Sequence, residues 1–181
     1  MKKILGNDTI YTERLEITPF EEKFITNKYI NWLNDPKVVK FSNQRFCIHT
    51  KESCEEYLDF NKNSPNIFWA IIEKTKNYGH IGNITAYIDI NHNTAEIAIL
   101  IGEKQVWGKG YGFEAWKAVC DFLFSERSIR KVTAGTLACN YGMVNVAKKY
   151  GMEMEGRRIR QEIFDNIEVD IIYFGLFNPN I

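Results

Sequence analysis

The chain has 181 residues, of which 45% are hydrophobic and 25% are charged, values that are ordinary for a soluble globular protein with one sizeable core. Lys and Arg together number 23, as do Asp and Glu, so the formal net charge is zero. This balance argues against broad electrostatic attraction to nucleic acid or to an acidic membrane. From the length we expect a single domain over residues 1–181, and from the charge balance we expect it to bind neither nucleic acid nor membrane.

The amino-terminal segment lacks the features of a signal peptide, because Lys2 and Lys3 are followed by no apolar stretch. The longest apolar run, residues 171–177, is far too short to cross a bilayer. The four cysteines contain no Cys-x-x-Cys pair and no histidine lies at zinc-finger spacing, so we expect free thiols and no metal. These features favour a cytoplasmic location.

The first part of the chain predicts one strand and two helices. Residues 10–18 alternate in polarity as a strand does, and Pro19 ends the pattern. Residues 20–33 place apolar groups on one face of a helix. Thr50 can cap a second helix that runs to about residue 61, with Ser53 or Glu52 reaching back to the backbone.

The remaining chain predicts most of a sheet and two further helices. Three strands joined by short polar turns form an antiparallel meander over residues 67–73, 79–90 and 94–102. The other predicted elements are a helix over 111–127, a strand over 131–138, a helix over 140–150 and strands over 152–160 and 166–177. This order predicts an α/β (α+β) fold with a mixed, mainly antiparallel central sheet of about seven strands, flanked by about four helices.

A glycine-rich loop with the sequence Gln-Val-Trp-Gly-Lys-Gly-Tyr-Gly occupies residues 105–112, between an apolar run and an amphipathic stretch. Glycines at alternate positions allow positive φ and close approach to a ligand, and the start of a helix attracts phosphate. The loop matches neither the Walker motif nor the dinucleotide fingerprint, because Gly112 comes only two residues after Gly110. A plain strand-to-helix turn that binds nothing is the alternative at this point.

The loop, with the strand before it, resembles the Gln/Arg-x-x-Gly-x-Gly/Ala pyrophosphate loop of the GCN5-related N-acetyltransferases. Asn140 and the later stretch Ala-Lys-Lys-Tyr-Gly-Met at 147–152 resemble that family's Asn-containing last helix. Thr-Glu-Arg-Leu at 12–15 resembles the start of its RimJ/RimL-like branch. The resemblance covers about residues 11–177 and implies an enzyme that transfers the acetyl group of acetyl-CoA to a primary amine, directly and in a ternary complex, without a metal.

The resemblance also implies which residues bind the coenzyme. The pyrophosphate would lie on the N–H groups of residues 106–110, with Gln105 capping the loop. The pantetheine arm would pair with residues 99–101, where that strand splays from its neighbour, and an N–H near Leu100 would stabilise the oxyanion. The implied coenzyme-binding residues are Ile99, Leu100, Ile101, Gln105, Val106, Trp107, Gly108, Lys109, Gly110, Tyr111, Gly112, Asn140, Asn145 and Lys149.

The acceptor amine must lose a proton before it attacks, which requires a base or a water relay. Glu96 is the predicted base, at a position where RimJ/RimL-like proteins commonly carry Glu. Burial among Ile97, Ile99 and aromatic rings would raise the pKa of Glu96 to a useful value. The alternative is a strand glutamate that faces solvent or pairs with Lys or Arg.

The acid that would reprotonate the coenzyme A thiolate is less defined. The position at which many relatives carry a Tyr is Ala147, and the position of a Ser in the RimJ/RimL-like branch is Met143. Tyr150 is the predicted acid, with Tyr141 or water as alternatives. The missing Tyr and Ser also leave a non-catalytic acetyl-CoA-binding module as an alternative of another class.

The acceptor site of such proteins is usually built from the first two helices and the last hairpin. Here these segments carry a mixture of charges: Arg45, Arg157, Arg158, Arg160, Glu162 and Asp165. The arginines favour a phosphorylated or carboxylated small molecule, such as a nucleotide-linked amino sugar. Protein N-terminal amines, polyamines, antibiotics and amino acids are the alternatives. Edge strands near the carboxyl end also suggest a homodimer.

Overall fold

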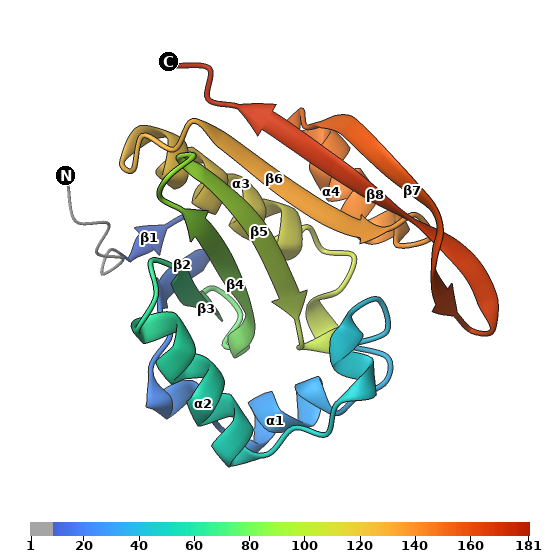
Figure 1. Cartoon of the computed structure of the whole chain (residues 1–181). Coiled ribbons are helices and arrows are strands. Elements are labelled where there is room, and N and C mark those ends of the chain that lie inside the picture. The colour runs from blue at the N-terminus through green and yellow to red at the C-terminus, as the bar shows by residue number, and fades with distance from the viewer. Residues whose placement is uncertain (1–8) are drawn as a thin grey trace.

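The computed structural model of the chain describes residues 9–181, through which one eight-stranded sheet runs in the order β1-β2-β3-β4-β5-β6-β8-β7 (Figure 1). The strands are β1 (Ile10–Tyr11), β2 (Leu15–Pro19), β3 (Ile67–Glu73), β4 (Gly79–Asp89), β5 (Thr94–Ile101), β6 (Lys131–Leu137), β7 (Glu153–Phe164) and β8 (Ile167–Phe177). The helices are α1 (Asn27–Leu33), α2 (Lys51–Lys62), α3 (Tyr111–Ser125) and α4 (Tyr141–Tyr150). The predicted fold class and the meander β3-β4-β5 are confirmed.

The single first strand predicted over residues 10–18 is wrong, because the chain folds back within it. β1 and β2 pair antiparallel, with Ile10 opposite Ile17. The turn between them is held by Thr12, whose backbone N–H donates to the Leu15 carbonyl and whose hydroxyl oxygen accepts from the Leu15 N–H, each at 2.9 Å. The extra strand gives the sheet eight strands, not about seven.

The helix predicted over residues 20–33 is also shorter than expected. A 3-10 turn at Glu22–Phe24 comes first, and α1 begins only at Asn27 because Thr26 acts as its N-cap. The second helix forms as predicted: the Thr50 and Ser53 side chains make a reciprocal capping box at the start of α2. Two short helices with defined caps therefore stand before the meander.

The two faces of the sheet are covered by different helices, and alternate residues of β3 show the division. Trp69 and Ile71 belong to a core cluster with residues of α3 and with Ala147 of α4. Phe68 and Ala70 point the other way, into a second cluster with α1 and α2. Side chains alternate between the two faces along a strand. The pairing of the strands therefore also decides toward which face each side chain of β5 and β6 points.

β5 and β6 run parallel but pair over three residues only, ending with Glu96 opposite Thr133. Beyond that pair the strands diverge, as Figure 1 shows, and β6 continues its pairing with β8 on its other side. Within residues 9–181, no strand pairs with this edge of β5 beyond Glu96. The structure therefore contains the splayed pair of strands that the family resemblance implied.

β7 and β8 form a long hairpin at the carboxyl end of the chain. β7 extends to Phe164, four residues beyond the predicted end. The turn predicted at 164–166 is present, with Asp165 and Asn166 at φ of 49° and 62°. Two adjacent positive φ values are what a two-residue hairpin turn needs, and Asp and Asn tolerate them.

Candidate active site

The glycine loop connects β5 to α3 through two residues with positive φ. Gly108 has φ of 73° and Gly110 has φ of 83°, a backbone conformation that other residues adopt only with strain. Gly110 is also the N-cap of α3, and no side chain of the described chain caps the first turn of that helix. Its free N–H groups and the positive end of the helix dipole are therefore available to an anion.

The start of the loop is anchored to β5 and to α1. The Trp107 indole N–H donates to the Ile101 carbonyl at 2.8 Å. The Glu103 carboxylate accepts from the Gln105 N–H and pairs with Lys28 at 3.0 Å. The neighbouring Lys104 pairs with Asp35 at 2.5 Å. Gln105 itself is exposed, and Trp107 is 43% exposed on the loop surface.

The predicted coenzyme residues outside the loop lie on β5 and α4. Ile99, Leu100 and Ile101 occupy the part of β5 whose edge has no strand partner. The Asn140 amide caps α4 by accepting from the Met143 N–H at 3.3 Å, and it donates to the Thr136 hydroxyl at 3.0 Å. This bond ties the start of α4 to the end of β6, on the far side of the gap.

The two exposed α4 residues of the predicted set are Asn145 and Lys149, and Lys149 reaches toward α3. Its ammonium lies 4.2 Å from the centroid of the Phe113 ring. A groove of about 480 Å³ runs beside this pair, and its lining includes Phe113, Lys117, Asp121, Phe124, Lys149 and Tyr150. This groove lies on the α3–α4 face of the sheet and follows α3 from Phe113 to Ser125.

Glu96 lies where β5 and β6 separate, on the face of the sheet covered by α1 and α2. It stands opposite Tyr87 of β4, and its carboxylate is 3.9 Å from the space that a Cβ on Gly135 would fill. The predicted burial of Glu96 is wrong: its side chain is exposed and helps to line an open hollow of about 320 Å³ with Tyr87, Asp89, Thr94 and Thr133. The position at the gap is favourable, but the desolvation that the prediction invoked is absent.

Tyr150 is not brought together with Glu96. Its hydroxyl donates to the Asp121 carboxylate at 2.9 Å, in the groove between α3 and α4 on the opposite face of the sheet. Burial raises the pKa of Tyr150, and the neighbouring Cys120 and Asp121 raise it further. A hydroxyl that is held in this way is a poor proton donor to a thiolate in the gap.

Two tyrosines that the sequence reasoning missed do face the gap from the side of Glu96. The Tyr173 ring of β8 lies 3.2 Å from the space above Gly135, across that space from the Glu96 carboxylate. The Tyr87 hydroxyl lies 2.7 Å from the hydroxyl of Tyr57 on α2. Their place could have been read only from the strand register, since nothing in the sequence near them marks a site.

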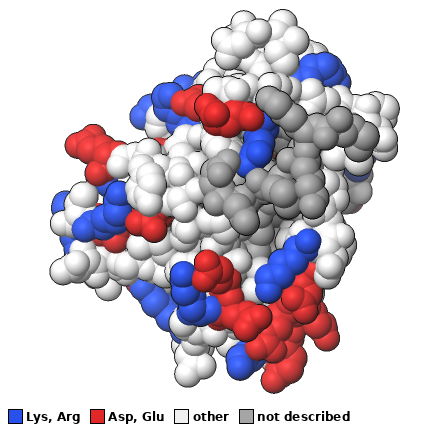
Figure 2. All heavy atoms as spheres, turned by 90° about the vertical axis from the view of Figure 1, so that its left-hand side faces the viewer, with Lys and Arg blue, Asp and Glu red and all other residues white. Residues whose placement is uncertain are grey.

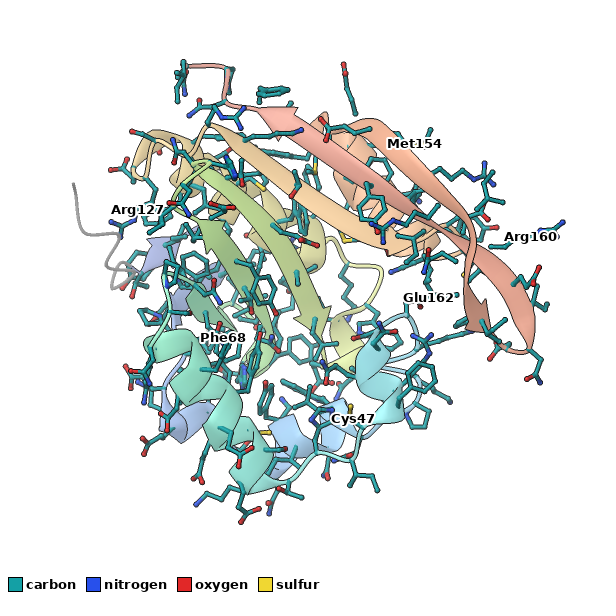
Figure 3. All side chains as sticks on the ribbon, in the orientation of Figure 1. Cys47, Phe68, Arg127, Met154, Arg160 and Glu162 are labelled. Carbon is teal, nitrogen blue, oxygen red and sulfur yellow. The ribbon has the colours of Figure 1, made fainter. Side chains whose placement is uncertain are left out.

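The predicted arginine cluster is largely neutralised. Arg45 pairs with Glu162 at 3.3 Å, Arg157 pairs with Asp170, and Arg160 pairs with Glu168 at 3.6 Å. In Figure 3, Glu162 lies between the hairpin and the segment that carries Cys47, whereas Arg160 projects away from the body of the protein. Arg158 differs: its guanidinium lies 5.2 Å from the Tyr173 ring centroid, and no carboxylate of the described chain pairs with it.

The fold, the loop and the splayed strands define an acetyltransferase, and the comparison with known families agrees. The model of the acetyltransferase (GNAT) domain matches residues 14–153, and the chain belongs to this family. A relative from Bacillus subtilis (strain 168), the uncharacterized N-acetyltransferase YnaD, is 28% identical over 147 residues that cover 81% of this chain and 84% of YnaD.

Solved structures share the fold over nearly the whole chain. RimL, a ribosomal L7/L12 alpha-N-protein acetyltransferase in complex with coenzyme A, superposes with a TM-score of 0.80 at 13% identity, covering 94% of this chain and 98% of RimL. The spermidine N-acetyltransferase from Vibrio cholerae, in complex with CoA and spermine, gives a TM-score of 0.79 at 17% identity, covering 92% and 97%. These structures show a RimL-like fold, and the family match shows that the chain is an acetyl-CoA-dependent N-acetyltransferase.

Three further features concern partners. No helix of residues 9–181 is both long and apolar enough to span a membrane. No three His, Cys, Asp or Glu side chains of these residues gather into a group that could hold a metal ion. On the face shown in Figure 2, positive and negative side chains of the described residues lie beside one another.

Proposed function

We propose that this N-acetyltransferase acetylates a small-molecule amine that carries a negative charge, such as a nucleotide-linked amino sugar. The observation that carries the proposal is Arg158, whose guanidinium has no carboxylate partner in the described chain and lies beside Tyr173. Tyr173 and Glu96 face each other across Gly135, where β5 and β6 separate. A phosphate or carboxylate on Arg158 would hold the amine of the same molecule toward Glu96.

The proposed coenzyme site consists of residues 99–101, the loop 105–112 and the α4 residues Asn140, Asn145 and Lys149. Free N–H groups at the start of α3 donate to the pyrophosphate oxygens, and the unpaired edge of β5 pairs with an extended pantetheine arm as it would with a strand. Acetyl-CoA, when bound there, supplies an acetyl thioester to the gap between β5 and β6. A backbone N–H near Leu100 then stabilises the charge that develops on the thioester oxygen.

The proposed base is Glu96, acting directly or through one water on the acceptor ammonium. Its solvent-exposed position allows it to pass the proton on to water, and Thr133 and Tyr87 border it within the same hollow. Coenzyme A is a fair leaving group, so water in this open hollow can protonate the thiolate. Tyr150 is not part of this scheme, because its hydroxyl lies on the opposite face.

The base is tested by Glu96→Gln, with Glu168→Gln as a matched control on an exposed strand glutamate of the hairpin. Removal of a general base typically lowers turnover by about 10²- to 10⁴-fold. We expect a fall in kcat of at least about tenfold, with the Kd for coenzyme A unchanged in calorimetry. Turnover equal to that of the control variant would remove Glu96 from the mechanism.

The acceptor is tested by coenzyme A release with UDP- and dTDP-linked amino sugars, spermidine, aminoglycosides and N-terminal peptides of ribosomal proteins. We expect release with an anionic amine, and a KM for it that rises about tenfold in Arg158→Ala, since a charged hydrogen bond is lost. Arg157→Ala is the matched control, because Arg157 is bound to Asp170. Release with spermidine or with peptides alone would overturn this acceptor class, and binding without any release would favour a non-catalytic module.

The expected homodimer remains a prediction. β7 is an edge strand of the sheet, and most of its residues are exposed. A strand edge of this kind can pair with a second copy unless charge or irregularity prevents it. Sedimentation of the purified protein measures the state directly.

A further inference from the structure

The segment Thr12–Leu15, which the family resemblance singled out, has no role in the proposed chemistry, yet it contacts the start of α3. The Thr12 hydroxyl donates to Oε1 of Glu114 at 2.6 Å, and the Arg14 backbone N–H donates to the same oxygen at 3.0 Å. The Arg14 side chain binds the other oxygen, with Nε at 2.6 Å and Nη2 at 2.5 Å from Oε2. Residues about 100 positions apart in the chain thus form one closed cluster.

Arg14 reaches beyond Glu114 into the glycine loop itself. Its Nη1 donates to the backbone carbonyl of Lys109 at 3.0 Å, between the two glycines of positive φ. Its guanidinium carbon lies 4.1 Å from the centroid of the Tyr111 ring, the first residue of α3. One side chain therefore holds both the loop backbone and the first turn of the helix.

The loop needs such a contact because glycines at 108 and 110 leave its backbone free to adopt many conformations. Before Gly108, Trp107 and Glu103 anchor the loop to β5 and α1. After Gly108, the loop is exposed up to Tyr111, and the side-chain donor that binds one of its backbone carbonyls is Arg14. Preorganised N–H groups bind an anion more tightly than groups that must first be ordered.

Charge gives Arg14 a second effect. Glu114 stands in the first turn of α3, where an uncompensated carboxylate would repel a pyrophosphate. Burial would raise the pKa of Glu114, but the hydrogen bonds from Thr12 and Arg14 outweigh it and lower the pKa, so the group is ionised at neutral pH. The Arg14 guanidinium cancels this charge at the place where the coenzyme binds.

We propose that Arg14 is a positioning residue for the acetyl-CoA loop: through the Lys109 carbonyl it fixes the loop N–H groups, and through Glu114 it neutralises the first turn of α3. The inference rests on the proposed assignment of residues 105–112 as the coenzyme loop. It assigns a function to the Thr-Glu-Arg-Leu motif that lies outside the coenzyme and acceptor sites. Arg14 acts through the loop backbone and does not itself contact the coenzyme.

The test is the Kd for coenzyme A, measured by calorimetry on the full chain, which requires no acceptor. We expect Arg14→Ala to weaken binding at least about tenfold, the loss of one charged hydrogen-bond anchor. With any amine that supports turnover, the KM for acetyl-CoA should rise while kcat at saturating coenzyme is kept. A purely structural defect would instead lower kcat and the melting temperature together.

Arg130→Ala is the matched control. Arg130 also donates to a backbone carbonyl, that of His92 at 3.3 Å, and also lies over a ring, that of Phe177 at 5.6 Å. It is remote from the glycine loop, so we expect coenzyme A to bind this variant within about twofold of the wild type.

A double variant separates the two effects of Arg14. In Arg14→Ala with Glu114→Gln, the repelling carboxylate is gone but the Lys109 carbonyl still lacks its donor. We expect partial recovery of affinity, with a residual loss of at least about threefold. Full recovery would overturn the positioning role, and so would an Arg14→Ala variant that binds like Arg130→Ala.

Where Arg14→Ala fails to fold, Arg14→Lys provides the same test, because one ammonium cannot bind Glu114 by two nitrogens and the Lys109 carbonyl as well. Wild-type affinity in Arg14→Lys would overturn the proposal. A substitution of Gly110 provides the check on the proposed function: if it too leaves binding unchanged, the coenzyme site itself is misassigned and the failure is not specific to Arg14.

Discussion

The proposed active site has two halves that are held in different ways: a coenzyme half at the glycine loop, and an acceptor half on the face of the sheet covered by α1 and α2, which includes the carboxyl-terminal hairpin. The loop is fixed at two places, by Glu103 and Trp107 before its glycines and by Arg14 at the Lys109 carbonyl between Gly108 and Gly110. The hairpin is long, its outer strand β7 is mostly exposed, and its tip touches the rest of the protein through Arg45 with Glu162 and through the Phe41–Phe164 ring pair at 5.3 Å. The coenzyme half is thus specified by backbone, and the acceptor half by a few side chains.

The difference has a chemical reason. A pyrophosphate can be bound by backbone N–H groups, which every sequence provides once the loop has the right conformation. Recognition of an amine and its other substituents needs particular side chains at particular positions. One family fold can therefore keep one coenzyme site and present a different acceptor site in each member.

The largest expected effect is on the backbone of the coenzyme half. Gly108→Ala with Gly110→Ala places Cβ atoms at two positions of positive φ, at about 1–2 kcal/mol each, and should weaken coenzyme A binding about a hundredfold. Gly79→Ala is the control, because Gly79 also has a positive φ, of 63°, and nothing lies within 4 Å of its Cβ, but it stands outside the glycine loop at the start of β4. Calorimetry gives the Kd for coenzyme A of the wild type, the double variant and the control. Equal affinities in all three would show that the loop conformation does not decide binding.

The second effect is on the acceptor half. A Cβ on Gly135 would lie 3.2 Å from the Tyr173 ring and would fill the space between that ring and Glu96. We expect Gly135→Val to lower kcat/KM for the acceptor about tenfold, with the Kd for coenzyme A within about twofold of the wild type. Gly156→Val is the control, since nothing lies within 4 Å of its Cβ. An equal loss of kcat/KM in both variants would show that the space above Gly135 has no specific role in acceptor binding.

As the pH is lowered, the acceptor half should lose folding stability at a higher pH than the coenzyme half. His80 packs against the rings of Phe20, Phe24 and Trp32 on the acceptor face, and burial lowers its pKa to about 4. The unfolded state binds a proton at a pKa of 6.5, so stability is complete above pH 6.5 and falls by up to about 3 kcal/mol as the pH drops from 6.5 to 4.

Glu73 is the corresponding buried group under the coenzyme half, near the Tyr111 hydroxyl at 3.5 Å. Burial would raise the pKa of Glu73, but hydrogen bonds from Thr75, Lys76 and Tyr78 outweigh it and lower the pKa to about 2. Its contribution is therefore lost only as the pH falls from 4.5 toward 2.

Denaturant unfolding between pH 7 and pH 4 tests this order. His80→Phe, which cannot titrate, should flatten the fall of stability over that range. Amide exchange should show α1 losing protection before the N–H groups of Thr75, Lys76 and Tyr78, which donate to Glu73. A wild-type stability that does not change between pH 7 and pH 4, or the reverse order of exchange, would contradict the assignment.

The smallest expected effect is at the hairpin tip. Arg45→Ala breaks the ion pair with Glu162, which is half-buried and contributes no more than about 1 kcal/mol to stability. The KM for the acceptor should rise two- to threefold, with coenzyme A binding unchanged, because only the acceptor half is loosened. Lys51→Ala, which removes an exposed pair with Glu55 on α2, is the control. A change in coenzyme affinity would show that the two halves are coupled.

The sequence by itself determined the elements whose signals are local. The meander, the capping box of α2, the turn at Asp165 and Asn166, and the glycine loop at the start of α3 depend on residues close together in the chain. Local propensity and hydrophobic period decide such features, so they could be predicted. The family resemblance depended on the same local motifs and was confirmed.

Only the tertiary structure decided which distant side chains meet. It placed Tyr150 against Asp121 and away from Glu96, left Glu96 exposed, and brought Tyr173 beside Gly135 and Arg158 beside Tyr173. It also joined Arg14 to Glu114 and to the loop. These outcomes follow from strand register and from the face each residue takes in the folded sheet, which neither composition nor spacing along one chain segment contains.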